Sequence, residues 1–164
     1  MEMIVMFLLT FVIVWLFGTF IFPFTFTADW INSNAKNGPG YILIKPGVNA
    51  AIWAQELYEA RRAWMYLPMH VPLILIGRLI PDLAFYERSH EIMGQEVEVQ
   101  AESLLFRADL KVIRRREAQD LASYRAFIGW DVDQIEEKMI EKSTAAFKFV
   151  TDNRYVILER HRVK

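Results

Sequence analysis

The start of this sequence is its strongest constraint on folding, because no charged side chain occurs between Glu2 and Asp29. A helix needs about 20 apolar residues to cross roughly 30 Å of hydrocarbon, and Met3–Phe22 is long enough for this. Pro23 is expected to end that helix. No Lys or Arg precedes the run and no small-x-small site follows it, unlike a cleaved signal peptide. The sequence therefore predicts an uncleaved transmembrane anchor over residues 1–28.

The charges that flank this run predict how the protein lies in a membrane. Lys36 and Lys45 follow it, whereas no basic residue precedes it. By the positive-inside rule, the remainder of the chain would face the cytoplasm. We expect a single-pass membrane protein with the lipid bilayer as one partner. The alternative location is a virion membrane.

Composition limits the classes to which the rest of the chain can belong. The 164 residues suffice for one domain, and 54% hydrophobic with 24% charged residues indicates a folded one. The net charge of −1 lacks the basic excess of a nucleic-acid-binding protein, so no nucleic acid is expected as a partner. The absence of cysteine excludes disulfides, thiolate zinc sites and cysteine nucleophiles.

The segment after the anchor begins with turn-forming residues, and we interpret residues 29–40 as a linker. A short β-branched and aromatic run over 41–45 predicts a strand. Asn49 precedes a helical pattern whose apolar stripe is formed by Ala50, Trp53, Leu57, Ala60 and Trp64. Residues 65–80 contain several prolines and predict a buried connection, with an interfacial dip toward the membrane as the alternative.

The second half of the chain is predicted to be mainly helical. One helix is expected over 87–116, bent at Gly94, and further helix follows to a break at Gly129. Asp131 and Gln134 resemble a capping box that opens another helix, and its acidic residues would pair with the basic helix before it. Residues 155–158 suggest a second short strand. The predicted fold is mainly α: an N-terminal transmembrane helix and a small helical domain, residues 41–164, with one or two short strands.

Glutamates at helical spacing form the most specific chemical pattern. Gln55-Glu56-Leu57-Tyr58-Glu59 lies on the first predicted helix of the domain, and Glu98 and Glu102 lie on the second. Residues at i and i+4 share one helical face, so both can reach one metal ion. The glutamate after the first ligand can take a proton from a metal-bound water.

These two segments resemble the gluzincin-type zinc metallopeptidases, which carry HExxH and, further along, ExxAD or ExxAE. The resemblance covers about residues 41–106 and implies a degenerate zincin-like fold. It implies that Gln55, Glu59 and Glu98 stand at the metal-ligand positions, with Glu102 in support. It also implies that Glu56 stands at the position of the general base.

The sequence departs from that family at both histidines. An amide and carboxylates suit Mg²⁺, Ca²⁺ or Mn²⁺ better than zinc, so no cofactor is predicted, with a divalent metal ion as the alternative. A chance match remains open, in which Gln55, Glu56 and Glu59 are the solvated face of an amphipathic helix. The three histidines (His70, His90 and His161) are interpreted as surface or hydrogen-bonded side chains.

Three functions follow from these observations. The first is a membrane-anchored, metallopeptidase-like protein that acts by noncatalytic binding or assembly. The second is a structural membrane protein of a virion or envelope complex that packs against other subunits or copies of itself, since short chains of this kind resemble proteins encoded by bacteriophages. The third is an active metal-dependent hydrolase with Glu56 as general base.

Overall fold

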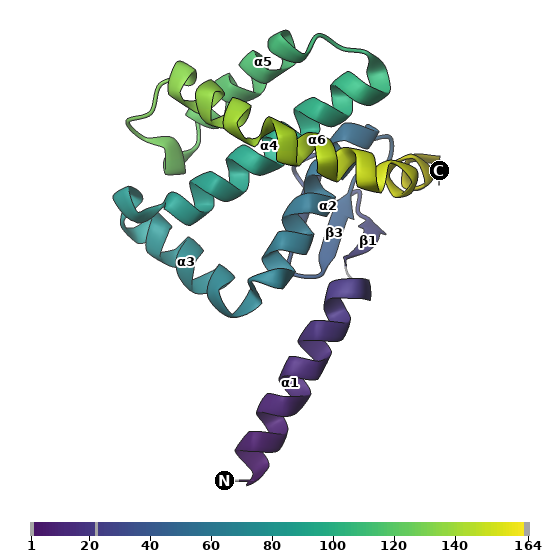
Figure 1. The fold of residues 1–164 in the computed structure, drawn as a ribbon, viewed down its shortest axis with the longest axis vertical. Helices are drawn as coiled ribbons and strands as arrows, with labels where there is room; N and C mark the ends of the chain where they lie inside the picture. Colours follow the sequence, from purple (N-terminus) through teal and green to yellow (C-terminus); the bar gives the residue numbers. More distant parts are fainter. Residues whose placement is uncertain (1, 22, 163–164) are drawn as a thin grey trace.

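The fold is that of a computed structural model, which describes residues 2–21 and 23–162, with side chains at 3–18, 21, 23–80 and 82–159. Helix α1 projects from a body of five further helices with a small sheet at one side, against α2 (Figure 1). Helix α4 lies at the centre of that body and contacts α2, α3, α5 and α6. The prediction of a mainly helical protein with short strands is confirmed for the body.

Helix α1, Glu2–Ile21, corrects the prediction of an anchor. Among the described residues, no helix is both long and apolar enough to cross a membrane. Residues 24–27 of the predicted anchor instead form a strand. The transmembrane helix over 1–28 is therefore a wrong prediction. So are the single-pass and virion-membrane locations that depended on it.

The sheet has the order β1-β3-β2 and joins the end of the apolar run to the helical body. Strand β1 (Phe24–Thr27) pairs in parallel with β3 (Tyr41–Ile44), and β2 (Ala35–Gly38) pairs antiparallel with β3. The turn between β2 and β3 contains Gly40 at φ 83°, a conformation that suits glycine. The strand over 41–45 is thus confirmed, and the segment 29–40 contains β2 in addition to turns.

Helix α2, Ala50–Met65, begins as its sequence predicts. The Asn49 side chain accepts hydrogen bonds from the backbone N–H groups of Ala51 and Ile52, both at 2.9 Å.

Helix α3, Leu67–Leu79, then replaces the predicted buried connection, and most of its side chains are exposed. Pro68 stands in its first turn, where no intrahelical N–H is needed. Only His70 and Gly77 of α3 are buried.

The predicted helix over 87–116 is two helices, α4 (Phe85–Phe106) and α5 (Leu110–Ala122). Arg107 ends α4 in the left-handed region at φ 58°, and the Asp109 side chain caps α5. This turn lets α5 fold back against α4.

Helix α6, Val132–Arg162, confirms the capping box and overturns the second strand. The Gln134 N–H donates to Asp131 Oδ1 at 2.8 Å, and the Asp131 N–H donates to Gln134 Oε1 at 3.0 Å. The predicted pairing of opposite charges is also present, since Arg115 donates to Asp133 and, at 2.9 Å, to Glu136. Residues 155–158 are helical because Ile157 continues a buried helical stripe rather than an alternating pattern.

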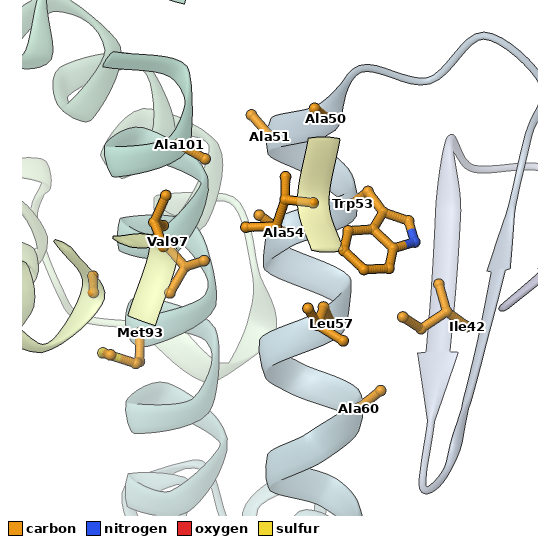
Figure 2. Packing of buried hydrophobic residues seen from close by; sticks show 13 residues of the cluster. Ile42, Ala50, Ala51, Trp53, Ala54, Leu57, Ala60, Met93, Val97 and Ala101 are labelled. Carbon is orange, nitrogen blue, oxygen red and sulfur yellow. The ribbon is translucent and has the colours of Figure 1, made fainter. Parts of the chain in front are cut away.

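Small side chains allow α2 and α4 to pack closely in the main core. Figure 2 shows Ala54 of α2 facing Val97 and Met93 of α4, whereas Trp53 lies on the side of α2 nearer Ile42 of β3. A second core cluster surrounds Phe127 and includes residues of α4, α5 and the first half of α6. The close approach of α2 and α4 brings the polar residues of both helices together.

Helices α4, α5 and α6 are further joined by a buried ion pair. Glu96 is fully buried, and Arg114 donates to both of its carboxylate oxygens, at 2.9 and 2.7 Å. Ser143 and Gln100 also donate to Glu96 Oε1, at 2.7 and 2.8 Å. Four donors on three helices therefore satisfy a carboxylate that has no access to water.

Candidate functional site

The residues predicted from the metallopeptidase-like pattern are buried at the junction of α2, α4 and β2. Gln55, Glu56 and Glu59 on α2, and Glu98 on α4, have exposed fractions of 9% or less. Their interpretation as a solvated helix face is therefore wrong. Glu102, one helical turn after Glu98, is paired with Arg116 at 3.1 Å.

Hydrogen bonds hold the α2 residues to one another and to the sheet. Gln55 Nε2 donates to Glu59 Oε1 at 2.9 Å, so the two positions expected to share a metal ion instead bond to each other. The Asn37 Nδ2 group on β2 donates to both Glu56, at 2.6 Å, and Glu59, at 2.7 Å. Each oxygen of the Glu59 carboxylate thus has an amide donor.

Gly94 on α4 provides the space that the Glu59 carboxylate occupies. A Cβ atom at residue 94 would lie 2.0 Å from Glu59 Oε1 and 2.8 Å from Glu59 Cδ. No side chain fits at that distance. The glycine is therefore required by the packing of α2 against α4, and α4 continues as a helix through it.

Gly94→Ala is expected to destabilise the protein by about 1–3 kcal/mol, because the new methyl group must displace a carboxylate held by two amides. Urea denaturation measures this change. In a Glu59→Ala background the clash is absent. There the same substitution should stabilise the protein by about 0.5–1 kcal/mol through the higher helix propensity of alanine. A stabilising Gly94→Ala in the unaltered chain would contradict this packing.

Burial gives the carboxyl groups of this site unusually high pKa values. Loss of water raises the pKa of Glu56 to about 7 and those of Glu59 and Glu98 to about 8. Burial is the largest cause of these values; the charges of neighbouring carboxylates contribute to the rise, and hydrogen bonds from Asn37 and Gln55 oppose it at the α2 residues. Near pH 7 these groups can therefore hold and release protons.

Two members of the site were not among its predicted residues. Glu91 on α4 has its pKa raised to about 8 by burial and by the charge of Glu59, so it belongs to the same carboxylate cluster. Its position seven residues before Glu98 places both on one helical face, a signal that was available in the sequence. Asn37 lies in a segment interpreted as a linker, and only the fold of the β2–β3 hairpin brings it to α2.

The two described histidines form a separate aromatic cluster rather than joining the carboxylates. His70 Nδ1 lies 2.9 Å from the Tyr86 hydroxyl, and the His90 ring stacks on Tyr86 and lies 5.5 Å from the His70 ring. Burial, with the nearby charge of Arg62, lowers the pKa of His90 to about 3. Both histidines are buried, as hydrogen-bonded or packed side chains. The side chain of His161 lies outside the described residues.

A cleft of about 460 Å³ lies next to the carboxylate cluster. Gly77, Arg78, Glu87, Tyr124, Arg125 and Ala126 line it. Burial raises the pKa of the Tyr124 hydroxyl, and the negative charges of Glu91 and Glu59 raise it further. Tyr124 therefore lines the cleft and also interacts electrostatically with Glu91 and Glu59.

The oxygen donors of the site suit a hard divalent cation rather than zinc. In the described part of the chain, however, no group of three or more His, Asp or Glu side chains is arranged to hold a metal ion. The Gln55–Glu59 hydrogen bond is part of the reason, because it directs the two side chains toward each other rather than toward a shared metal ion. The residues as placed do not fit a bound metal.

Comparison with known proteins provides no relative from which a role could be transferred. No protein-family model matches this chain, and neither a curated protein nor a solved structure is similar to it. The resemblance to the gluzincins remains a prediction from the motif.

Proposed function

We propose that this protein acts by noncatalytic binding, assembling with other protein subunits or with copies of itself through α1. The observation that carries this proposal is the apolar surface of that helix. Val5, Met6, Phe7 and Leu8 are all more than half exposed. Four successive positions at about 100° intervals cover the whole circumference of a helix. A helix that is apolar on all sides is stable when other apolar surface covers it.

The base of α1 is held firmly, which supports a role in docking. Trp15 Nε1 donates to the Trp64 carbonyl at 3.0 Å, and Trp64 Nε1 donates to the Trp15 carbonyl at 3.1 Å. A Cβ atom at Gly18 would lie 2.2 Å from the Trp64 ring, so α1 and α2 are in close contact there. The rest of α1 projects beyond the body (Figure 1).

The metallopeptidase-like residues support a noncatalytic role. The amide of Gln55 and the carboxylates of Glu56 and Glu59 are engaged with one another and with Asn37. They join α2 to β2 and pack against Gly94 of α4. In this arrangement the pattern connects α2, β2 and α4 within the body that carries α1.

Assembly through α1 predicts an oligomer that a charge on this helix disrupts. Sedimentation velocity of the gently solubilised full chain should show an oligomer, and Phe7→Glu should convert it to a monomer, because an unpaired charge cannot be buried at an apolar contact. Val112→Glu is the matched control, since Val112 is 67% exposed on α5, and should leave the oligomer unchanged.

Two outcomes would overturn this proposal. One is a monomeric wild-type chain that Phe7→Glu does not alter and that captures no protein through α1. The other is flotation of monomers with phosphatidylcholine vesicles, with loss of flotation in Phe7→Glu, which would assign the apolar surface to lipid.

The pKa of Glu56, raised to about 7, favours a metal-dependent hydrolase as a second candidate, because a general base works best near the ambient pH. This candidate requires Gln55 and Glu59 to separate and bind a metal with Glu98. Elemental analysis should then find a metal ion that is lost in Glu98→Ala, and Glu56→Gln should abolish hydrolysis without unfolding. A metal-free wild-type chain would contradict it.

A further inference from the structure

A second pocket, of about 240 Å³, lies between the start of α4 and the middle of α6. Its lining residues are Phe85, Arg88, Ser89, Ile92, Trp130, Lys138, Glu141 and Lys142. Phe85, Ile92 and Trp130 provide apolar and aromatic walls. The pocket is on the opposite side of α4 from the contacts between α4 and Glu59, since residues 85, 88 and 92 share a helical face that excludes Gly94.

Positive charge exceeds negative charge around this pocket. Lys138 Nζ is paired with Glu141 Oε1 at 2.6 Å. The Arg88 guanidinium donates to the carbonyls of Asp82 and Ala126, at 3.1 and 3.2 Å, and lies 5.3 Å from the centre of the Trp130 ring. These contacts place a cation beside the aromatic wall.

Lys142 carries the remaining positive charge. It is half-buried on α6, one helical turn after Lys138. No carboxylate among the described side chains lies within ion-pair distance of its amine. An ammonium group next to apolar walls is well placed to pair with a ligand anion, and such charge-assisted hydrogen bonds are stronger than neutral ones.

We propose that this pocket binds a small aromatic carboxylate, with its ring against Trp130 and Phe85 and its carboxylate paired with Lys142. The volume supports a ligand of one or two rings, because pockets for drug-sized molecules begin at about 300 Å³. Aromatic walls favour an aromatic body through stacking and edge contacts. The excess of cations favours an anionic head.

Calorimetric titration of the full chain with 2-naphthoate tests this proposal, with 2-naphthamide as the uncharged probe of the same shape. We expect saturable binding of 2-naphthoate at one site per chain and at least tenfold weaker binding of 2-naphthamide, since the amide lacks the charge. Lys142→Gln should weaken 2-naphthoate about tenfold and leave 2-naphthamide unchanged. Lys148→Gln, on the same helix but outside the pocket, should alter neither.

Three results would overturn the proposal. Equal affinity for the two probes would show that charge does not select the ligand. An unchanged affinity in Lys142→Gln would remove the assigned contact, and circular dichroism would establish that this variant is folded. Absence of saturable binding of either probe would show that the pocket is not a site for this class of molecule.

Discussion

Raising the pH from about 6.5 to 8 is expected to lower the free energy of unfolding by several kcal/mol. The cause is the carboxyl groups of Glu56, Glu59, Glu91 and Glu98, whose pKa values burial raises to about 7 or 8. In the unfolded chain they titrate near 4.5. Between pH 4.5 and these folded-state pKa values, the folded state binds more protons than the unfolded chain. The stabilisation is therefore complete below about pH 4.5 and is lost as the pH rises through the folded-state pKa values. Each group contributes up to about 1.4 kcal/mol per pH unit.

The window above pH 6.5 isolates the carboxyl groups from the histidines. The pKa of His90 is lowered to about 3, so its contribution to stability rises with pH up to about 6.5 and is then complete. Urea midpoints at pH 6.5 and 8 measure the change. Glu59→Gln should reduce the pH dependence of the urea midpoint, because it removes one of the four groups. Glu137→Gln, at an exposed position of α6, should leave that dependence unchanged. Stability that is constant or rising over this window would contradict the burial of these groups.

Arg114→Met is expected to destabilise the protein by about 3–5 kcal/mol. The substitution leaves the Glu96 carboxylate fully buried without its cation, with only Gln100 and Ser143 as donors. Chemical denaturation at neutral pH measures the loss. The adjacent Arg115 is the control, because its side chain is 44% exposed and that of its partner Asp133 is 82% exposed. Arg115→Met should cost no more than about 1 kcal/mol.

A second substitution separates the buried charge from the lost packing. In a Glu96→Gln background, Arg114→Met should cost much less, since no charge remains to be compensated. An equal cost in both backgrounds would show that the guanidinium acts by filling space. A cost of Arg114→Met that does not exceed that of Arg115→Met would contradict the burial of Glu96.

The assembly proposal and the carboxylate cluster concern different parts of the molecule, which makes their tests independent. Phe7→Glu changes a side chain that projects from the body. Gly94→Ala and Glu59→Gln change the junction of α2 and α4. The first should alter association without altering the urea midpoint of the body. The others should alter the midpoint and leave association unchanged.

The candidate site was only partly predictable from the motif. The spacing of Gln55 and Glu59 places them on one face of α2, and Glu98 lies on α4, but their role as metal ligands stays a prediction. The motif did not indicate that Gln55 and Glu59 bond to each other. An amide at the first position of the pattern donates a hydrogen bond to a carboxylate at the fifth, whereas two histidines would leave their lone pairs for a metal.

Local features of the sequence by themselves determined the elements whose signals lie within a few residues. The Asn49 cap, the capping box of Asp131 and Gln134, and the strand over 41–44 follow from such contacts. The break at Arg107 and the helical state of residues 155–158 did not, because the packing of α5 on α4 and of Ile157 in the core outweighs local propensity. The extent of the N-terminal run was also misjudged, since the pairing of β1 with β3 takes residues 24–27 out of it.

Only the tertiary structure decided which polar residues meet and which of them lose contact with water. Asn37 and Glu59 are 22 residues apart, and Glu96 and Arg114 are 18 apart. Each pair is hydrogen-bonded because the sheet packs on α2 and helix α5 packs on α4. Burial is a property of that packing. The sequence does not show whether a glutamate on a helix ends in water or inside the protein. The two environments give it different pKa values, and its contribution to stability differs between them by several kcal/mol.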